Sequence, residues 1–390
     1  MHLLQTIFSL PLLLPQALTS PTPPHHPRAA PNTPKDLTPL PLIIWHGLGD
    51  TYTNPSLTSL SDVVNEIHEG TYTHLIHLGD DAATDRRNTF LGNLTTQLAA
   101  VCAQLAADPI LSTAPAVNAI GFSQGGQFLR AYVERCNAPP VRTLITFGSQ
   151  HNGITRFQAC RWGDLVCLGA EALLHAGRWS GVVQGGFVPG QYFRPQAGVE
   201  DSISRSGSGA GAGAMEVEVG ELGDQGLEGE GEAQLGAQQQ QQQQQSEMEL
   251  YLQHSNFLAD VNNERDVKNE TYKENLSSLE KFVMLMFEED GVVHPKESAW
   301  FAEVDADGVV VGLRDRQIYK EDWLGLRELD EKGALVFRTV PGRHMEIGEE
   351  VFEKVVREFL GPVEVEVGVE AGLGADGSER RPGLVVQGAY

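Results

Sequence analysis

The sequence predicts an α/β fold, in which a mostly parallel central sheet is flanked by helices. Between residues 42 and 359, short apolar runs alternate with segments whose apolar residues recur at helical spacing. Parallel strands need crossover connections, which are usually helices, so this alternation favours a parallel sheet covered on both faces. The chain has 390 residues, enough to bury a large core.

The first part of the chain supplies two strands and a helix. Residues 42–45 read Leu-Ile-Ile-Trp, a buried strand between a proline and a His-Gly pair. Residues 72–78 form the second expected strand. A helix is expected to stop near Pro109, and four of its apolar residues share one face: Leu94, Leu98, Val101 and Leu105.

The next element carries the most specific motif. The apolar run 117–122 leads into Gly-Phe-Ser-Gln-Gly at residues 121–125, and a helix is expected over 126–136. Gly-x-Ser-x-Gly between a strand and a helix is the nucleophile-elbow pattern of α/β-hydrolases. The tight turn strains the backbone of Ser123, and the helix N-terminus aims N–H groups towards its oxygen. We therefore expect the α/β-hydrolase fold, with Ser123 as nucleophile.

After a strand at 142–147 the alternation stops. We expect residues 154–280 to form a helical cap region, and residues 196–248 within it to be a disordered insertion. The insertion consists of Ser/Gly and Gly/Ala repeats, scattered Glu and a glutamine run, and cannot bury enough apolar surface to fold. A helical stretch is expected over 249–279.

The alternation resumes with strands expected at 281–287 and 334–337. An amphipathic helix over 349–359 then closes a hydrolase domain that we expect to span 41–361. The apolar face of that helix carries Val351, Val355 and Phe359.

The two ends of the chain differ from this domain. Residues 1–20 hold an apolar run that is too short and too proline-broken to span a membrane, followed by small residues. We expect a signal peptide there and no transmembrane segment. No Lys or Arg precedes the run, so a disordered leader is the alternative. Residues 21–40 are expected to be a proline-rich disordered linker, and 362–390 a disordered acidic tail.

Charge and cysteine content narrow the class of protein. The chain has 28 Lys and Arg against 52 Asp and Glu, a net charge of −24, which argues against nucleic acid as a partner. The four cysteines are an even number, which favours two disulfides in a secreted chain. Three Asn-x-Ser/Thr sequons also fit the secretory route, with acceptors at Asn93, Asn269 and Asn275.

A nucleophilic serine needs a base and an orienting acid, and in this fold the chain order is Ser, acid, His. The acid should follow the strand that ends at residue 287. Asp290 stands at the turn there, before a glycine and two valines. Glu288, Glu289 and Asp260 are the alternatives. The base should follow the last strand, where Pro-Gly-Arg leads into His344 just before the closing helix.

His294 is the alternative base. For the oxyanion hole we expect the N–H of Gln124, after the nucleophile, and the N–H of Leu48 in the His-Gly-Leu-Gly-Asp loop. His46 in that loop is expected to be structural rather than catalytic. No Cys/His cluster has metal-ligand spacing and no phosphate loop is present, so we expect neither a metal nor another cofactor.

The motifs described above resemble those of one known family, the palmitoyl-protein thioesterases. The similarity covers roughly residues 41–360 apart from the insertion. It includes Trp-His-Gly-Leu-Gly-Asp at 45–50, Gly-Phe-Ser-Gln-Gly-Gly-Gln at 121–127 and Gly-Ser-Gln-His-Asn-Gly at 148–153. It continues through Asn-Phe-Leu-Ala-Asp-Val-Asn at 256–262, through 282–295, and in Gly-Arg-His at 342–344.

The resemblance implies a triad of Ser123, Asp290 and His344, the same residues that chain order selects. It also implies two disulfides, Cys102–Cys136 and Cys160–Cys167, and residence in the lysosome, in the vacuole or outside the cell. The implied activity is hydrolysis of long-chain fatty acyl thioesters, with S-palmitoylated proteins or peptides as substrates and the enzyme as a monomer.

Two departures from the family pattern stand out. Tyr52 and Thr53 occupy the positions where the family often has adjacent cysteines, so one bridge is missing. The acidic, Gln-rich insertion falls between residues 193 and 258, where the family builds its acyl groove, and therefore bears on chain-length preference.

Apolar cap residues are candidates for lining such a groove, although each fits an ordinary core equally well. They are Leu165, Leu168, Leu173, Trp179, Val183 and Phe187. Two other functions use the same residues: a secreted carboxylester lipase or acyl-CoA thioesterase with this triad, and a catalytically inactive hydrolase fold that binds lipid.

Overall fold

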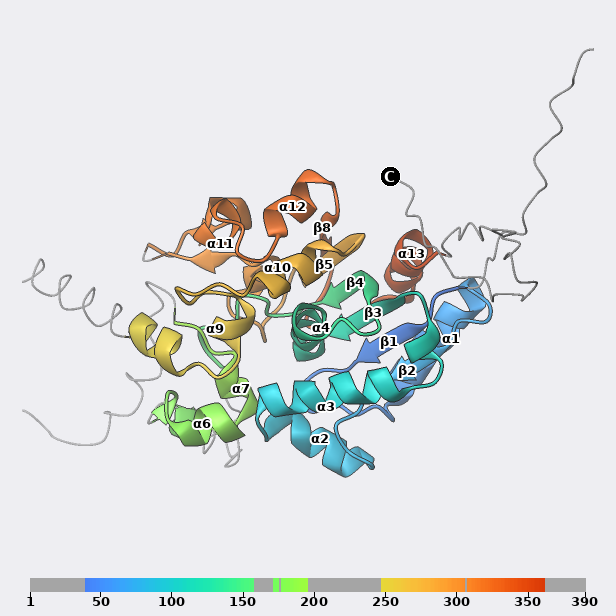
Figure 1. Cartoon of the computed structure of the whole chain (residues 1–390), viewed down its shortest axis with the longest axis horizontal. Helices are drawn as coiled ribbons and strands as arrows, with labels where there is room; N and C mark the ends of the chain where they lie inside the picture. Colours follow the sequence, from blue (N-terminus) through green and yellow to red (C-terminus); the bar gives the residue numbers. More distant parts are fainter. Residues whose placement is uncertain (1–38, 158–170, 175–176, 196–246, 306, 362–390) are drawn as a thin grey trace, which may run out of the picture. The chain divides into compact units, whose positions relative to one another are not determined.

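The computed structural model describes residues 39–157, 171–174, 177–195, 247–305 and 307–361. These residues belong to one compact unit, Leu37–Val365. Its centre is a six-stranded sheet with the order β2-β1-β3-β4-β5-β8 (Figure 1). The strands are β1 (Leu42–Trp45), β2 (Thr73–Leu75), β3 (Val117–Phe122), β4 (Val141–Phe147), β5 (Lys281–Phe287) and β8 (Leu335–Val340).

Every neighbouring pair of these strands is parallel. The register places Trp45 beside Gly121, Phe122 beside Phe147, and Phe287 beside Val340. The carboxyl ends of five strands therefore meet along one edge of the sheet, which is where ligands bind in parallel α/β sheets.

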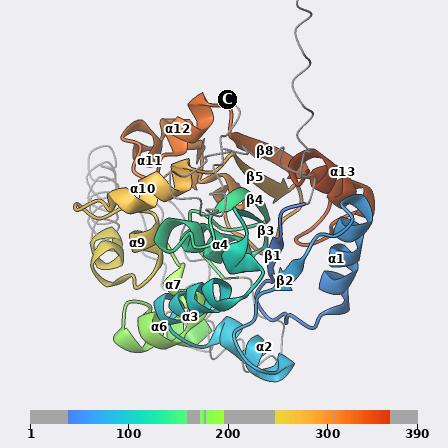
Figure 2. The same ribbon diagram turned by 45° about the vertical axis from the view of Figure 1, so that its right-hand side comes forward.

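Helices cover both faces of the sheet (Figure 2). Side chains alternate along β1: Ile43 and Trp45 belong to one apolar cluster, and Leu42 and Ile44 belong to the other. The first cluster includes residues of α3 (Leu94–Ala107), α4 (Gln124–Arg135) and α10 (Glu270–Ser277). The second includes residues of α1 (Pro55–Ile67) and α13 (Glu349–Phe359). This arrangement confirms the predicted α/β-hydrolase fold.

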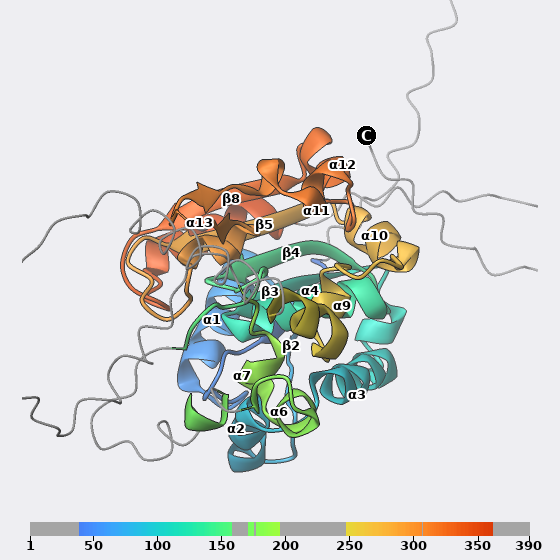
Figure 3. The same ribbon diagram turned by 90° about the vertical axis from the view of Figure 1, so that its left-hand side faces the viewer.

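The cap side of the molecule consists of short helices at the carboxyl edge of the sheet. The backbone of Gly92 donates to Gly186 O at 2.9 Å, and Leu91 bridges Phe187, so the cap contacts the end of α2 (Ala82–Phe90). Figure 3 shows α6 and α7 beside α2. The short cap helices are α6 (Gly181–Gly186), α7 (Val188–Gln191) and α9 (Leu258–Val261).

The remaining elements lie between β5 and β8. They are β6 (Glu303–Val304) and β7 (Val310–Val311), which pair antiparallel, and the helices α11 (Gln317–Lys320) and α12 (Leu326–Glu331). Short 3₁₀ turns occur at Leu111–Thr113, Lys296–Trp300 and Leu313–Asp315.

The expected helical stretch over 249–279 is wrong as one element. Residues 247–254 are helical, α9 follows, and α10 begins only at Glu270. The break has a local cause: Asn263 adopts φ 54°, which a helix cannot continue through, and Asn269 caps the start of α10 by accepting from Thr271 N.

Cys102 and Cys136 form a disulfide, the pairing that the resemblance implies for them. The other implied pair, Cys160–Cys167, lies outside the described residues, as do the expected signal peptide, linker and tail and residues 196–246 of the insertion. Within the described part of the chain, no helix is long and apolar enough to cross a membrane.

Candidate active site

Ser123 stands at the turn between β3 and α4. Its backbone has φ 53° and ψ −125°, a conformation that is strained for a residue with a side chain. Glycines allow the turn to pack closely: a Cβ on Gly121 would lie 2.2 Å from Gly126 Cα, and one on Gly125 would lie 2.3 Å from Trp45 O. Residues 121–126 therefore form a tight strand-to-helix turn, the geometry that a nucleophile elbow requires.

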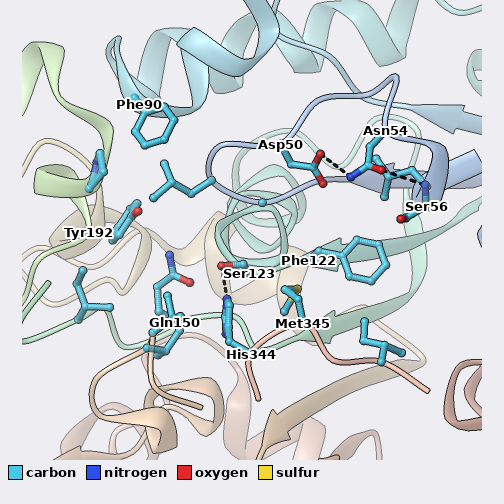
Figure 4. Close-up of a pocket in the computed structure, with 18 of the residues that line it drawn as sticks. Asp50, Asn54, Ser56, Phe90, Phe122, Ser123, Gln150, Tyr192, His344 and Met345 are labelled. Carbon is cyan, nitrogen blue, oxygen red and sulfur yellow. Dashed lines mark hydrogen bonds between the residues drawn. The ribbon is translucent and has the colours of Figure 1, made fainter. Parts of the chain in front are cut away.

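His344 lies beside Ser123 and is hydrogen-bonded to it (Figure 4). Asp290 extends the pair into a hydrogen-bonded chain. His344 Nε2 is 3.0 Å from Ser123 Oγ, and His344 Nδ1 is 2.7 Å from Asp290 Oδ2. The other carboxylate oxygen of Asp290 accepts from the N–H groups of Val292 and Val293, each at 2.9 Å. These contacts hold the imidazole with Nδ1 facing the acid and Nε2 facing the serine.

Two opposing effects act on the Asp290 carboxyl. Burial raises its pKa, while the hydrogen bond and charge of His344 and the N–H groups of Val293 and Val292 lower it; the net pKa is below the ordinary value. The carboxylate therefore stays ionised at neutral and mildly acidic pH and can stabilise a protonated imidazole.

The alternative acids and base make other contacts. Asp260 Oδ2 accepts from Arg135 at 2.5 Å and from the Tyr272 hydroxyl at 2.9 Å, on the far side of α4. His294 lies 2.9 Å from Gly291 O and 3.3 Å from Arg156 Nη2. Glu288 and Glu289 are exposed. The geometry favours Asp290 and His344 over all four.

The loop after β1 approaches the serine from the other side. A Cβ on Gly47 would lie 3.1 Å from Ser123 Cβ, so only a residue without a side chain fits there comfortably. Among the described residues, the backbone N–H groups of Leu48 and Gln124 have no hydrogen-bond acceptor. Both are therefore available to an oxygen bound next to Ser123 Oγ.

The buried carboxylate of Asp85 on α2 accepts hydrogen bonds from both ends of this loop. It accepts from His46 Nε2 at 2.9 Å and from Tyr52 N at 2.8 Å, and also from Leu78 N at 2.7 Å. Burial raises the pKa of Asp85. The His46 hydrogen bond and the backbone N–H groups lower this pKa by a larger amount, so the net pKa is below the ordinary value. His46 thus has a structural partner, in agreement with its expected role.

Hydrogen bonds also organise the segment where the family often has cysteines. Thr51 Oγ1 lies 2.8 Å from Thr53 Oγ1 and accepts from Thr53 N at 3.1 Å. The Tyr52 ring packs against His77, with centroids 4.9 Å apart. The turn is therefore held by polar contacts in place of the missing bridge.

The Gln124 side chain ties the elbow to the cap. Its amide nitrogen donates to Thr89 O at 3.3 Å, and its oxygen accepts from the Tyr192 hydroxyl at 3.2 Å. Burial raises the pKa of Tyr192, which keeps its hydroxyl protonated as a donor. This clamp orients the first turn of α4 and hence the Gln124 N–H.

Ser123 and His344 open into a groove of about 1510 Å³. On one side of the serine the groove runs between α1 and the segment before α13, and on the other it runs under the cap. Its apolar lining on the first side includes Leu57, Leu60, Val63, Phe122, Met345, Ile347 and Phe352. On the cap side it includes Phe90, Leu91, Ile154, Phe157, Leu174, Phe187, Pro189, Tyr192, Val292 and Val293.

Of the cap residues that the sequence suggested as groove lining, some line the groove and others do not. Phe187 lines the groove, whereas Val183 and Trp179 are core residues outside it. Leu173 is exposed, and its neighbour Leu174 lines the groove instead. Leu165 and Leu168 lie outside the described residues.

Several residues that line the groove were not predicted from the sequence, because they lie on α1 and that helix was not predicted. Its signals are present in the sequence: Asn54 caps the helix by accepting from Ser56 N, and Pro55 occupies its first turn. Asp85 was also missed, since no local pattern marks a carboxylate whose partners come from three segments. In the described part of the chain, no group of three or more His, Cys, Asp or Glu is placed to hold a metal.

Comparisons with known proteins place this site in a family. The family model described as palmitoyl protein thioesterase matches residues 41–207 and 231–344. Palmitoyl-protein thioesterase 1 of Caenorhabditis elegans is 32% identical over 326 residues, which is 82% of this chain and 92% of that protein. Palmitoyl-protein thioesterase 3 of Dictyostelium discoideum is 29% identical over 78% of this chain and 84% of that protein.

Among solved structures, the thioesterase domain from the curacin biosynthetic pathway matches 83% of this chain and 90% of that chain, at 10% identity and a TM-score of 0.31. The family assignment does not depend on that likeness. It follows from the family model, which matches most of the chain, and from a relative that is more than 30% identical over nearly its whole length. The chain belongs to the palmitoyl protein thioesterase family.

Proposed function

We propose that this enzyme releases long-chain fatty acids such as palmitate from S-acylated cysteines of proteins or peptides, with Ser123, His344 and Asp290 as its catalytic triad. Family membership makes the chain a thioester hydrolase. The observation that carries the residue assignment is the Ser123–His344–Asp290 hydrogen-bond chain, which opens into a long apolar groove.

In the first half-reaction Ser123 Oγ attacks the thioester carbonyl carbon while His344 Nε2 takes its proton. Asp290 holds the resulting imidazolium. The C–S bond then breaks, and the imidazolium protonates the departing thiolate. An acyl-enzyme on Ser123 remains.

The carbonyl oxygen becomes negative during this attack. The free N–H groups of Leu48 and Gln124 stabilise it, helped by the positive end of the α4 dipole. A donor of this kind contributes a factor of about 10² to 10³ in rate. In the second half-reaction His344 removes a proton from water as the water oxygen attacks the acyl carbonyl carbon. The bond between that carbon and Ser123 Oγ then breaks, the imidazolium returns its proton to Oγ, and the fatty acid leaves.

The groove explains why the acyl group should be long. Each buried CH₂ contributes roughly 0.8 kcal/mol, so a chain of many methylenes gains binding energy that a short acyl group lacks. The apolar residues that line the groove on either side of Ser123 are suited to this.

The test compares an S-palmitoyl peptide, palmitoyl-CoA and a palmitoyl oxygen ester as substrates for the wild type and Ser123→Ala. We expect the wild type to release palmitate from the peptide and the variant to lose this activity. Cleavage of the oxygen ester alone would identify a carboxylester lipase, and cleavage of palmitoyl-CoA alone an acyl-CoA thioesterase. Equal inactivity of wild type and variant, with lipid bound by both, would identify a lipid-binding protein.

The proposal includes the secretory route, with the lysosome or vacuole as a destination, an N-terminal signal peptide, and function as a monomer. Relatives named lysosomal thioesterase support the compartment, including one from Mus musculus that is 26% identical over 76% of this chain. Of the proposed glycan acceptors, Asn269 is exposed and Asn93 is half-buried. Asn275 donates its amide nitrogen to Glu134 O at 3.0 Å, so its side chain is already engaged.

A further inference from the structure

A second hollow, of about 760 Å³, opens from the groove at the N-terminal end of α1 and along α2. The two share four residues: Asp50, Asn54, Arg87 and Phe90. We call the second hollow the side pocket. Because the two spaces share these walls, a molecule whose reacting bond lies at Ser123 can extend from the groove into the side pocket.

The side pocket differs chemically from the groove. Arg86 and Arg87 line it, and both are exposed. Among the described residues, no carboxylate forms an ion pair with either guanidinium. Among the residues that line the side pocket, these two cations outnumber the carboxylates, although the whole chain has a net charge of −24.

Asp50 is the one carboxylate among the described residues that line the side pocket. Its Oδ1 accepts from Thr51 N at 2.8 Å and from Asn54 Nδ2 at 2.7 Å, a contact visible in Figure 4. Asp50 is thus engaged by its own loop, and the arginines remain available to a ligand. Thr53 and Asn54 add a hydroxyl and an amide to the same wall.

A thioester substrate has an apolar acyl half and a more polar half that carries the sulfur. The acyl chain needs the apolar groove, and the half that carries the sulfur must leave through a polar opening next to Ser123. We propose that the side pocket binds this sulfur-bearing half and selects peptides with an acidic residue beside the S-acylated cysteine. This inference rests on the proposed function and extends it to the substrate's sequence.

The pocket suits an anionic group on the sulfur-bearing half of the substrate. Two guanidiniums can each donate paired N–H groups to a carboxylate. The two guanidiniums would also attract a phosphate monoester. The proposed substrates, however, are S-acylated peptides. We therefore assign the site to an acidic side chain of a peptide and treat coenzyme A as the competing ligand in the test.

The experiment uses three S-palmitoyl peptides that differ only in the residue next to the cysteine, which is Glu, Gln or Lys, and palmitoyl-CoA. The enzymes are the wild type, Arg86→Glu/Arg87→Glu, and the charge-conserving Arg86→Lys/Arg87→Lys. Lys320→Glu/Arg327→Glu is the matched control, since it changes the net charge equally at exposed residues that line neither cavity.

We expect the wild type to favour the Glu peptide over the Gln peptide in kcat/KM by roughly 5-fold to 20-fold, mainly through KM, because each of the two exposed ion pairs contributes up to about 5-fold. The Arg-to-Glu double variant should favour the Lys peptide instead. The Arg-to-Lys variant and the control should keep the wild-type order. Raising NaCl to roughly 0.5 M should shrink the preference.

The same order of peptides in the wild type and the Arg-to-Glu variant would overturn the inference. A loss of activity in the Arg-to-Glu variant that is confined to palmitoyl-CoA would also overturn it, because the site would then bind the nucleotide phosphates. If the wild type cleaves the Gln peptide without any charge preference, only this inference fails. If it cleaves none of the peptides, the proposed function fails and this inference fails with it.

Discussion

At the scale of single residues, the imidazole of His344 is held in one tautomer by its neighbours. Asp290 Oδ2 faces Nδ1 at 2.7 Å, so the proton sits on Nδ1 and leaves Nε2 as an acceptor for the Ser123 proton. The two N–H groups on the other oxygen of Asp290 prevent the carboxylate from turning away. In the proposed mechanism, the reactivity of Ser123 therefore depends on Asp290, a residue that does not touch the substrate.

Asp290→Asn tests this dependence. An amide at this position can present an N–H to His344 Nδ1, which then carries no proton, and Nε2 becomes a donor that cannot take the serine proton. We expect kcat to fall by about 10⁴, with KM changed by only a few-fold. Steady-state kinetics on an S-palmitoyl peptide measure both. Glu289→Gln, a similar change at an exposed neighbour, should retain activity, and an Asp290→Asn enzyme of near-normal kcat would contradict the assignment.

The elements around the elbow meet without side chains between them. A Cβ on Gly125 would approach Trp45 O to 2.3 Å and Trp45 C to 2.7 Å. Both are backbone atoms of β1, which is hydrogen-bonded on both sides and cannot yield easily. The start of α4 and the end of β1 are therefore fixed against each other, and this contact sets the spacing between Ser123 and the loop of Gly47.

Gly125→Ala should push α4 away from β1. We expect a loss of about 1–3 kcal/mol in the free energy of unfolding, from overpacking, and a lower kcat in the folded enzyme. Urea unfolding and kinetics on the same preparations measure the two effects. Gly185→Ala on α6 is the control, since nothing lies within 4 Å of the added methyl group. It should be neutral or slightly stabilising, and equal effects at both positions would contradict the packing argument.

The sequence predicted those elements whose pattern is local. The strands at 42–45, 117–122 and 281–287 and the closing helix at 349–359 have the predicted bounds. The candidate triad followed from chain order, since each of its residues comes directly after a strand. Two features were not predicted. The expected helix over 249–279 breaks at Asn263, where the positive φ is not evident from helical periodicity, and the hydrogen bonds of the Asp85 carboxylate form only once β1, β2 and α2 have assembled.

At the scale of the whole molecule, stability should decline in acid because buried carboxylates are ionised in the fold. Asp85 and Asp290 both have pKa values below the ordinary value of about 4. A lowered pKa contributes stability that is fully present above the unfolded-state pKa and is lost as pH falls through the folded-state pKa. These two groups therefore leave stability flat from neutral pH to about pH 5 and remove it below about pH 4.

Asp85→Asn should flatten part of this acid limb. The variant also loses one or more buried hydrogen bonds, so we expect its free energy of unfolding at neutral pH to drop by about 1–3 kcal/mol. Thermal unfolding at a series of pH values measures both changes. Asp80→Asn, at an exposed carboxylate just before α2, should leave the profile as in the wild type. An unchanged acid limb in the Asp85 variant would show that this carboxyl is not part of the linkage.

The turn of Thr51, Tyr52 and Thr53 has a consequence for redox behaviour. Where relatives often carry neighbouring sulfurs, this chain holds its Leu48 donor with hydrogen bonds and with the Asp85 carboxylate. No electron transfer can cut such contacts, so a thiol reductant has no target in this loop. The loop that carries the proposed Leu48 donor is therefore sensitive to pH and not to a thiol reductant, and we expect this loop to keep its conformation in a reducing compartment that would open a sulfur-bridged loop.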